Sequence, residues 1–451
     1  MHRTKGHPID ETNPEGEEEL HPSYERTYCV IGAGASGLAA AKNLKQHGIP
    51  CCVLERESDL GGLWNYANPN SSIYRSTHLI SSKPLTEFTD FPMPDDYPDY
   101  PSHLRVMEYF RAYARSFGLE ELIEFDTAVE RIDFAGELWE VTLADGQTRR
   151  YGGVIIANGH LWDPNFPDTP GEFSGLAIHS KAYKTPDILR DKRVLVVGAG
   201  NSGCDIAVES AQNAAATFHS VRRGYYYIPK YMFGKPADQV GEITLKLRVP
   251  LAIRRAVNTF IVKTIYGQPE HFGLPKPDHK LFESHPIVNS QIYYYLGHGD
   301  ITPKPDLQEL RGDRVRFTDG SEEQIDVIIY ATGYKISFPF IDKKYLNWRG
   351  HHPELLLNIF HPVYDNLFVA GLIQPDSGQW GLVDYQTKLI ARFVLAQEHQ
   401  PAKAQIFRKL KADPSAFRNG GIRYIQSMRH EIEVEHFSYR ERLKRLIGTL
   451  S

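Results

Sequence analysis

Two glycine-rich turns in this chain have the spacing that brings backbone N–H groups against a phosphate. The first is Gly32-Ala33-Gly34-Ala35-Ser36-Gly37, and it directly follows an apolar strand expected at Tyr28–Ile31. The second is Gly198-Ala199-Gly200-Asn201-Ser202-Gly203, which begins 166 residues later, after a strand expected at Val194–Val197. The three glycines permit a tight bend, a close approach of backbone to a pyrophosphate, and close helix–strand packing. A helix N-terminus would then present its free N–H groups to the phosphates.

The segments after the two turns are also laid out alike. Each turn precedes a helix of small residues, expected at Leu38–Leu44 and Cys204–Ala211. Each copy later has an Asp-Gly hairpin turn, Asp145-Gly146 or Asp319-Gly320, and thirteen residues further a buried strand closes on a glycine, Gly159 or Gly333. We expect the first hairpin turn to join a strand at Trp139–Leu143 to the strand that closes at Gly159. One such turn also occurs in unrelated α/β units, but two in register predict two dinucleotides and electron transfer between them.

The ends of the second strands indicate which nucleotide each copy binds. In the first copy, Cys52-Val53-Leu54 leads into Glu55, 23 residues after Gly32, and a carboxylate there accepts hydrogen bonds from a ribose diol. In the second copy, the strand at 218–221 leads into Arg222 and Arg223 with no acid. A guanidinium group suits a phosphate on the ribose 2′ position. The first copy is therefore interpreted as an FAD site and the second as an NADPH site, with a solvated strand end as the alternative for the arginines.

These elements predict an α/β fold of two nested Rossmann-like dinucleotide-binding domains, one for FAD and one for NADPH. Residues 1–26, with three prolines and an acidic patch, are expected to be a flexible arm. The FAD-binding domain would comprise residues 27–165 and 335–451, and the NADPH-binding domain residues 166–334. A last buried strand at Asn366–Gly371 would deliver the following loop, through Pro375, to the flavin.

Residues 234–300 exceed what a nucleotide-binding unit needs, so we treat them as an insertion in the NADPH-binding domain. The insertion is rich in proline and tyrosine and contains a basic amphipathic stretch, Leu245–Tyr266. We interpret this stretch as an ordinary packed surface helix, in preference to a face that touches a membrane. The insertion as a whole is expected to shape a substrate channel or a subunit contact.

Composition narrows the classes of partner. A net charge of −5 and a pI of about 6.4 do not favour nucleic-acid binding, and they direct the search to small molecules. None of the four cysteines forms a C-x-x-C pair, so no metal is expected and the usage fits a reducing compartment, which predicts a cytoplasmic location. The chain has no apolar run of about 18 residues, so no integral membrane segment is expected. We expect a homodimer.

Several further motifs identify a resemblance to a known family. Between the two turns, Phe173-Ser174-Gly175-Leu176-Ala177-Ile178-His179-Ser180-Lys181-Ala182-Tyr183 matches the Phe-x-Gly-x-x-x-His-x-x-x-Tyr fingerprint of the class B flavin-containing monooxygenases. The similarity extends to Gly61-Gly62-Leu63-Trp64, Ala331-Thr332-Gly333-Tyr334 and Gly371-Leu372-Ile373-Gln374-Pro375, and it covers nearly the whole chain from Tyr28 onward. Tyr183-Lys184 stands where the related Baeyer–Villiger monooxygenases usually have Trp and then Pro or Asp.

The resemblance implies an NADPH-dependent flavin monooxygenase with FAD and NADPH as cofactors and O2 as co-substrate, NADH being tolerated in one subgroup. In such enzymes the reduced flavin takes up O2 at C4a, and the resulting (hydro)peroxide oxygenates a sulfide, an amine or a ketone while the protein excludes water. The expected cofactor-binding residues lie in both turns and in the motifs above: Gly32, Gly34, Ala35, Ser36, Gly37, Glu55, Leu63, Trp64, Ile80, Ser81, Gly198, Gly200, Asn201, Ser202, Gly203, Asp205, Arg222, Arg223, Thr332 and Gln374.

One position departs from the family pattern. Ile80 stands where the family usually has an Asn that touches both flavin and nicotinamide, and an isoleucine side chain cannot make those hydrogen bonds. His78 is the nearest substitute, and the type II subgroup, which has a histidine in place of that Asn and attacks ketones, resembles this chain more closely. His78 is therefore the candidate catalytic residue, with a satisfied structural histidine as the alternative.

Other classes of protein remain to be weighed against a monooxygenase. A disulfide reductase would share both folds but needs a pair of redox cysteines beside the flavin, which the sequence lacks. An NADPH-dependent flavin reductase or electron-transfer flavoprotein would reduce one-electron acceptors and form no oxygenated product. A non-catalytic scaffold would have little reason to keep both nucleotide turns intact. A monooxygenase is the class we expect.

Overall fold

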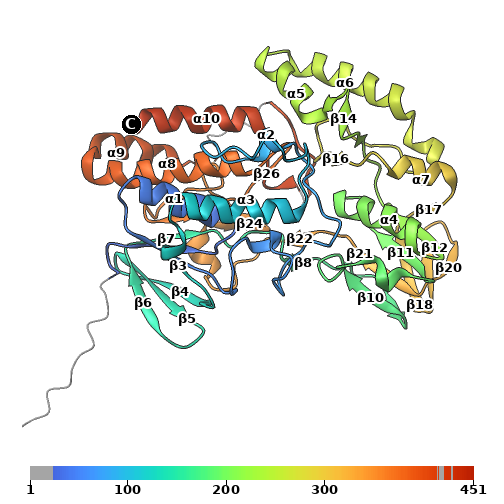
Figure 1. Cartoon of the computed structure of the whole chain (residues 1–451), viewed down its shortest axis with the longest axis horizontal. Coiled ribbons are helices and arrows are strands. Elements are labelled where there is room, and N and C mark those ends of the chain that lie inside the picture. The colour runs from blue at the N-terminus through green and yellow to red at the C-terminus, as the bar shows by residue number, and fades with distance from the viewer. Residues whose placement is uncertain (1–23, 414, 416–420, 428–429) are drawn as a thin grey trace, which may run out of the picture.

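The computed structural model has two lobes, each built around a five-stranded parallel sheet (Figure 1). It describes residues 24–413, 415, 421–427 and 430–451, so residues 1–23 of the expected N-terminal arm lie outside the described residues. The first sheet has the order β25 (Leu367–Val369), β7 (Gly153–Ile156), β1 (Tyr28–Ile31), β2 (Cys51–Leu54) and β3 (Ile123–Glu124). β7 and β25 are buried along their whole length, as strands covered on both faces must be.

The second sheet repeats this architecture. Its order is β10 (Leu176–His179), β21 (Val327–Tyr330), β11 (Arg193–Val197), β12 (Ala216–Ser220) and β17 (Ile301–Lys304), and all four pairings are parallel. In both sheets the strand before a glycine-rich turn is central. Side chains of β21, and of β11 from Val194 onward, are fully or almost fully buried on both faces. The fold class inferred from the two turns, a pair of Rossmann-like domains, is confirmed.

Helices cover the first sheet and pack against one another. α1 (Ala35–Gln46) packs along α8 (Trp380–His399), and α8 packs on α10 (His436–Thr449) and α9 (Pro401–Lys411); in Figure 1 these C-terminal helices lie beside the N-terminal α1. Between α1 and α8, the buried Lys42 ammonium contacts Asp384 at 2.6 Å and Asp90 at 2.8 Å. The C-terminal part of the chain thus completes the domain that the N-terminal part begins.

The first hairpin turn is correct, but its predicted partner strand is wrong. Asp145-Gly146 joins β5 (Leu138–Leu143) to β6 (Thr148–Tyr151), which is antiparallel to it in a separate sheet that begins with β4 (Val129–Ala135). The strand that closes near Gly159 is β7, in the parallel sheet. Exposure alternates along β6, whereas β7 is buried on both faces. The two segments therefore have different environments and form two separate strands. The second turn, Asp319-Gly320, joins β19 (Arg314–Phe317) to β20 (Glu322–Gln324).

The chain passes between the lobes twice, and the two passages run side by side. β8 (Asp163–Pro164) on the outward passage pairs antiparallel with β22 (Tyr334–Lys335) on the return. We place the domain boundaries at these paired segments, near the expected residues 165 and 334.

The insertion forms a cap at the edge of the second lobe (Figure 1). It contains α5 (Ala237–Lys246), α6 (Leu251–Tyr266), β16 (Ile287–Val288) and α7 (Ile292–His298). The single amphipathic stretch expected at Leu245–Tyr266 is therefore two helices. The break lies before Pro250, because a proline disfavours helical geometry at the residue before it, and Arg248 has a φ of +52°.

The outer face of α6 also differs from the expected packed surface helix. Val262 is the buried residue of α6, whereas Ile253, Val257 and Phe260 are half or more exposed. Only one narrow side of α6 therefore packs on the protein, and a row of apolar side chains faces outward.

Candidate functional site

The first glycine-rich turn forms a cradle in which Gly32 and Gly37 cannot be replaced without strain or a clash. Gly32 has a φ of +100°, and a Cβ on Gly37 would lie 1.7 Å from the Gly32 carbonyl oxygen. Gly34 is the N-cap of α1 and has no side-chain capping hydrogen bond. The first N–H groups of α1 are thus available to an anion, as a pyrophosphate site requires. A Cβ on Gly34 would lie 3.6 Å from Gly62 Cα, which is an ordinary van der Waals contact, so the protein itself does not exclude a Cβ at this position.

Glu55 is held at the end of β2, directly beside this turn. Its carboxylate accepts the Ala33 N–H at 2.6 Å and the Glu57 N–H at 3.0 Å. Burial raises the pKa of Glu55, while those two N–H groups act in the opposite direction. The contact with Ala33 fixes the carboxylate next to the phosphate-binding turn, which is the position that a ribose-binding acid needs.

The loop after β25 reaches the same turn from the far end of the chain. A Cβ on Gly371 would lie 2.1 Å from Ser36 Oγ, so a glycine is needed for this approach. Gln379 donates to the Gly371 carbonyl at 3.0 Å, and Gln374 donates to Glu433 at 2.7 Å. The expected delivery of residues 372–375 toward the first nucleotide site agrees with this geometry. The turn, Glu55 and this loop together fit an FAD.

The second turn has the same construction. Gly198 has a φ of +111° and a Cβ there would lie 2.5 Å from the Ala331 carbonyl oxygen, while a Cβ on Gly203 would lie 1.9 Å from the Gly198 carbonyl oxygen. Gly200 is the N-cap of α4 (Asn201–Asn213) and provides no side-chain capping hydrogen bond. The free N–H groups at the start of α4 therefore fit a second pyrophosphate.

Two expected nucleotide ligands of the second site are instead engaged with other parts of the protein. The Asn201 side chain accepts the Val288 N–H at 2.8 Å and donates to the Pro286 carbonyl at 3.3 Å, which binds the insertion to the start of α4. Asp205 accepts from the Tyr74 hydroxyl at 3.1 Å and from Asn289 at 2.7 Å. Burial raises the pKa of Asp205. Both side chains position the domains and the insertion around the nucleotide site.

The two arginines after β12 differ in their surroundings. Arg223 makes two hydrogen bonds to the Asp278 carboxylate, at 2.8 and 3.0 Å. The Arg222 side chain is 81 % exposed, and Asp306, the carboxylate that pairs with it, is 4.0 Å away. Arg222 is thus the freer of the two guanidinium groups for a 2′-phosphate, and Arg223 would first have to leave Asp278.

The fingerprint segment occupies the junction between the lobes. Burial lowers the pKa of His179 to about 4, so the ring is neutral; it hydrogen-bonds the Gly333 carbonyl at 3.0 Å and accepts the Lys181 N–H at 3.2 Å. The Tyr183 hydroxyl donates to Glu209 at 2.6 Å, and a Cβ on Gly175 would lie 2.5 Å from the Asp326 carbonyl oxygen. His179 thereby joins the end of β10 to the return passage at Gly333.

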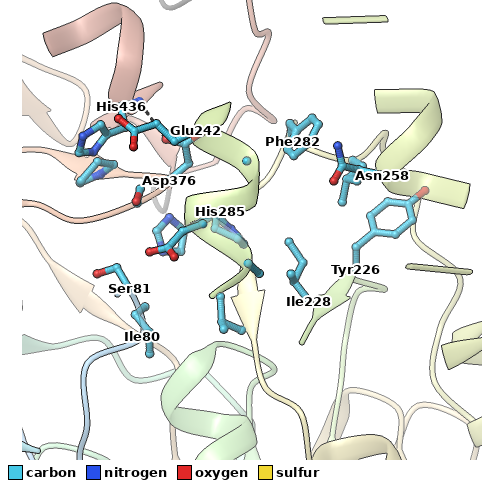
Figure 2. Close-up of a pocket in the computed structure, with 18 of the residues that line it drawn as sticks. Ile80, Ser81, Tyr226, Ile228, Glu242, Asn258, Phe282, His285, Asp376 and His436 are labelled. Carbon is cyan, nitrogen blue, oxygen red and sulfur yellow. Dashed lines mark hydrogen bonds between the residues drawn. The ribbon is translucent and has the colours of Figure 1, made fainter. Parts of the chain in front are cut away.

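A cavity of about 160 Å³ lies between the first lobe, the insertion and the C-terminal segment (Figure 2). Ile80 and Ser81 line it on one side, and Figure 2 places Tyr226, Asn258 and Phe282 on the opposite side and Asp376 and His436 on a third. Most of the wall is aliphatic or aromatic. A site of this kind accepts a small, mostly apolar molecule.

His78 and Ile80 are placed differently with respect to this cavity. Ile80 contributes to its wall, whereas His78 is exposed, is not one of the residues that form the wall, and bonds the Ser76 carbonyl through Nδ1 at 2.8 Å. The role expected for His78 therefore stays a prediction.

The remaining expected cofactor residues are held by local contacts. Trp64, which follows Leu63 in a short 3-10 turn, packs edge-on against Trp380, and the Leu63 carbonyl accepts from Ser71. The Ser81 hydroxyl pairs with Thr86 at 2.8 Å. Thr332 donates to the Asn165 carbonyl at 2.5 Å, on the paired passages between the lobes.

Three acidic residues of the cavity, Asp238, Glu242 and Asp376, were missed in the sequence. Asp238 of α5 accepts the Ser82 N–H at 2.7 Å, and nothing in the composition of the insertion indicates that contact. Asp376 directly follows the Gln374-Pro375 motif. Its position next to an expected cofactor-binding loop could have identified it as a site residue. Burial, followed by the charges of Glu435 and Glu433, raises the pKa of Asp376 from 3.8 to about 7.

The described part of the chain offers no candidate for two other kinds of site. No helix among the described residues is both long enough and apolar enough to cross a bilayer. Nor do the described residues contain three or more His, Cys, Asp or Glu side chains grouped so that they could hold a metal ion.

Comparisons with known proteins agree with this geometry. Residues 25–451 match the family model described as FMO-like, flavin-binding monooxygenase-like. The chain is 32 % identical to flavin-containing monooxygenase 5 of Homo sapiens over 447 residues, which cover 94 % of this chain and 83 % of the relative. It is 34 % identical to dimethylaniline monooxygenase [N-oxide-forming] 2 of Macaca mulatta, with coverage of 83 % and 74 %.

Solved structures of monooxygenases share the fold. Cyclohexanone monooxygenase from Rhodococcus sp. Phi1 bound to NADP+ superimposes with a TM-score of 0.68 at 18 % identity, covering 94 % of this chain and 98 % of that one. S-allyl-L-cysteine S-oxygenase from Allium sativum gives a TM-score of 0.64 at 21 % identity, covering 94 % and 89 %. At these identities the likeness extends to the architecture of two dinucleotide-binding lobes.

Proposed function

Since the chain belongs to the flavin-binding monooxygenase-like family, we propose that its cavity beside Ile80 is where small apolar sulfides, amines and ketones are oxygenated. The enzyme is an FAD- and NADPH-dependent monooxygenase that consumes O2. One oxygen atom enters the product, the other leaves as water, and NADPH supplies the two electrons. The observation that carries the proposal is a mostly apolar cavity whose wall includes the Ile80–Ser81 segment.

The residues around the two turns would hold the cofactors. The start of α1, Glu55 and the Gly371–Gln374 loop would bind FAD, and the start of α4 with Arg222 would bind NADPH. When bound, the flavin accepts a hydride from the nicotinamide and activates O2. The protein positions the two cofactors, shapes the cavity and keeps water out of it.

Ketone oxidation is the finer part of the proposal, and it rests on Ile80. An isoleucine at this wall removes the amide that the family places beside flavin and nicotinamide, and His78 lies two residues away in the same segment. A neutral imidazole can donate a hydrogen bond to a carbonyl, and a charged one stabilises an oxyanion. Oxidation of nitrogen has support from the relative whose name specifies N-oxide formation.

Three properties beyond the reaction are part of the same proposal. We propose that NADPH is preferred over NADH by a modest factor, because Arg222 is open and Arg223 is paired with Asp278. We propose a homodimer, supported by the exposed apolar side chains of α6, which a second copy would cover. A cytoplasmic location is proposed from the four cysteines, all of which are free thiols.

Product analysis tests the proposal directly. The FAD-loaded enzyme is incubated in air with NADPH and one substrate at a time from a panel of sulfides, tertiary amines and ketones. The products are identified by mass spectrometry. Sulfoxides, N-oxides, and esters or lactones with one added oxygen atom are expected. Consumption of NADPH with no oxygenated product from any of these substrates would contradict it.

A further inference from the structure

A second, smaller cavity of about 40 Å³ lies next to the cavity beside Ile80. Among the described residues that line the two cavities, Tyr226 is the only one common to both. Figure 2 shows Tyr226 on the side of the first cavity opposite Ile80. The Tyr226 side chain therefore stands between the two spaces.

The two cavities follow one another along α6. Asn258 lines the first cavity, and Val262, about one turn later, lines the second. Positions four residues apart lie on the same face of a helix, so one side of α6 borders both spaces. A loop of the insertion does the same, because Pro277 lines the second cavity and His279 the first. The two cavities are thus arranged end to end, with Tyr226 at their junction.

The backbone at Tyr226 is held by the next residue in the chain. Tyr227 belongs to β13 (Tyr227–Ile228), which pairs in parallel with β16, and the Tyr227 residue is only 1 % exposed. The Tyr226 ring packs edge-on against His279, with the ring centroids 5.7 Å apart. Because Tyr227 fixes the backbone, the size of the side chain at position 226 decides where the first cavity ends.

The second cavity has an apolar floor and a polar outer edge. Its buried lining residues are Tyr227, Val262, Pro269 and Tyr293. Its exposed lining residues are Lys263, Gln268, Glu270 and Lys276. The space therefore extends from Tyr226 toward the protein surface. Its floor suits a hydrocarbon chain, which gains free energy by leaving water, and does not suit a charged group.

We propose that Tyr226 is the specificity-determining residue that limits the length of the apolar substrate. A substrate whose reacting atom lies at the Ile80 side has its distal end at Tyr226, because the two residues lie on opposite sides of the cavity. With a small side chain at position 226, the distal end of a longer hydrocarbon chain enters the second cavity and leaves water. The inference deepens the proposed function and rests on it for the position of the reacting atom.

A homologous series of thioethers, from methyl butyl sulfide to methyl decyl sulfide, tests the length limit. Dissociation constants are measured by equilibrium dialysis with the FAD-loaded enzyme, and KM values for sulfoxidation are measured with NADPH in air. In the unmodified enzyme, each added methylene should lower the dissociation constant by up to about fourfold while the chain stays in the first cavity. The fall should stop at one chain length, the cut-off, where the chain meets Tyr226.

Truncation of Tyr226 should move the cut-off to longer chains. A chain two carbons beyond the original cut-off should bind about tenfold tighter to Y226A than to the unmodified enzyme, because both methylenes are then buried. Y226F keeps the ring and should keep the original cut-off. Y294A is the matched control, because Tyr294 is a tyrosine of α7 in the same insertion, is 58 % exposed and lines neither cavity. It should leave the cut-off unchanged.

The outcomes separate this proposal from the proposed function. The absence of a cut-off in the unmodified enzyme would overturn the role of Tyr226, and so would an unchanged cut-off in Y226A or an equal shift in Y294A. A cut-off that shifts in the dissociation constants, with no sulfoxide from any member of the series, would keep the length limit and contradict the proposed function. If Y226A does not fold, Y226L takes its place: its cut-off should also move to longer chains, and an unmoved cut-off would overturn the proposal.

Discussion

Asp238 of α5 accepts the backbone N–H of Ser82 at 2.7 Å, and this bond joins the insertion to the segment that carries Ile80 and Ser81. Asp238 is partly buried and also accepts the Gln239 N–H. The insertion therefore sets the position of the segment that forms one wall of the cavity. A hydrogen bond from a backbone N–H to a buried carboxylate contributes about 1.5–3 kcal/mol.

The first prediction concerns this bond. D238A should raise the KM for an apolar sulfide several-fold and increase the NADPH consumed per sulfoxide formed, because the cavity wall is no longer held against the insertion. D238N should restore most of the loss, since an amide oxygen also accepts the Ser82 N–H. The measurement is NADPH consumption against product. If D238A and the unmodified enzyme consume the same amount of NADPH per sulfoxide formed, the contact between Asp238 and Ser82 does not position the cavity wall.

The second prediction separates binding of FAD from folding. G34V should give a folded protein with little or no FAD, because a Cβ at Gly34 meets protein atoms only at van der Waals distance and, in the proposed FAD site, the side chain would stand against the pyrophosphate. G37V should lose the fold itself, because its Cβ would lie 1.7 Å from the Gly32 carbonyl oxygen. Absorbance of bound flavin and circular dichroism check both. Full FAD content in G34V would place the flavin elsewhere.

The third prediction is that Arg222 and Arg223 contribute unequally to NADPH binding. R222A should raise the KM for NADPH about tenfold or more with little change for NADH, because a charged contact to the 2′-phosphate contributes about 1.5–3 kcal/mol. R223A should have the smaller effect, since Arg223 is already bonded to Asp278. Steady-state kinetics with both coenzymes provide the check. Equal effects on NADPH and NADH in R222A would move the 2′-phosphate away from Arg222.

The fourth prediction is a pH dependence of stability. The pKa of Asp376 is raised from 3.8 to about 7, so its contribution to folding is present at low pH and is lost as the pH rises through about 7. The shift corresponds to up to about 4 kcal/mol of the free energy of unfolding. D376N should match the unmodified protein only near pH 4; it should become more stable by an amount that grows up to about pH 7 and is constant above it, as followed by urea unfolding. A difference that does not change with pH would mean that Asp376 titrates normally.

The fifth prediction tests the role expected for His78. H78A should reduce ester or lactone formation from a ketone more than it reduces sulfoxidation, because the carbonyl needs a donor or a positive charge and sulfur does not. The ratio of the two product yields from one enzyme preparation is the measurement. An unchanged ratio would leave His78 as an exposed surface histidine bonded to the Ser76 carbonyl.

The elements around the two turns could be predicted from the sequence because their requirements are local. β1 begins and ends at the predicted residues, and β11 differs from its prediction by one residue. Glycine is favoured where φ lies near +100° or a backbone approaches closely, so the turns at Gly32 and Gly198 are visible in the sequence. The Asp-Gly hairpin turns were also predicted correctly, because their requirements are local too. The partner strand of the first turn was predicted wrongly, because strand pairing depends on what covers each face of the strand in the folded protein.

The sequence by itself determined two nucleotide-binding turns, the acid and the arginines at the strand ends, and the family. The tertiary structure alone decided that Asn201 and Asp205 bind the insertion, that Arg223 is paired with Asp278, and that Asp238 meets Ser82. It also decided that Asp376 and His436, 60 residues apart, share one cavity wall. A phosphate-binding turn is specified by the backbone geometry of six neighbouring residues. The chemistry of a side chain in a cavity depends on burial and on partners from distant segments, which only the folded chain brings together.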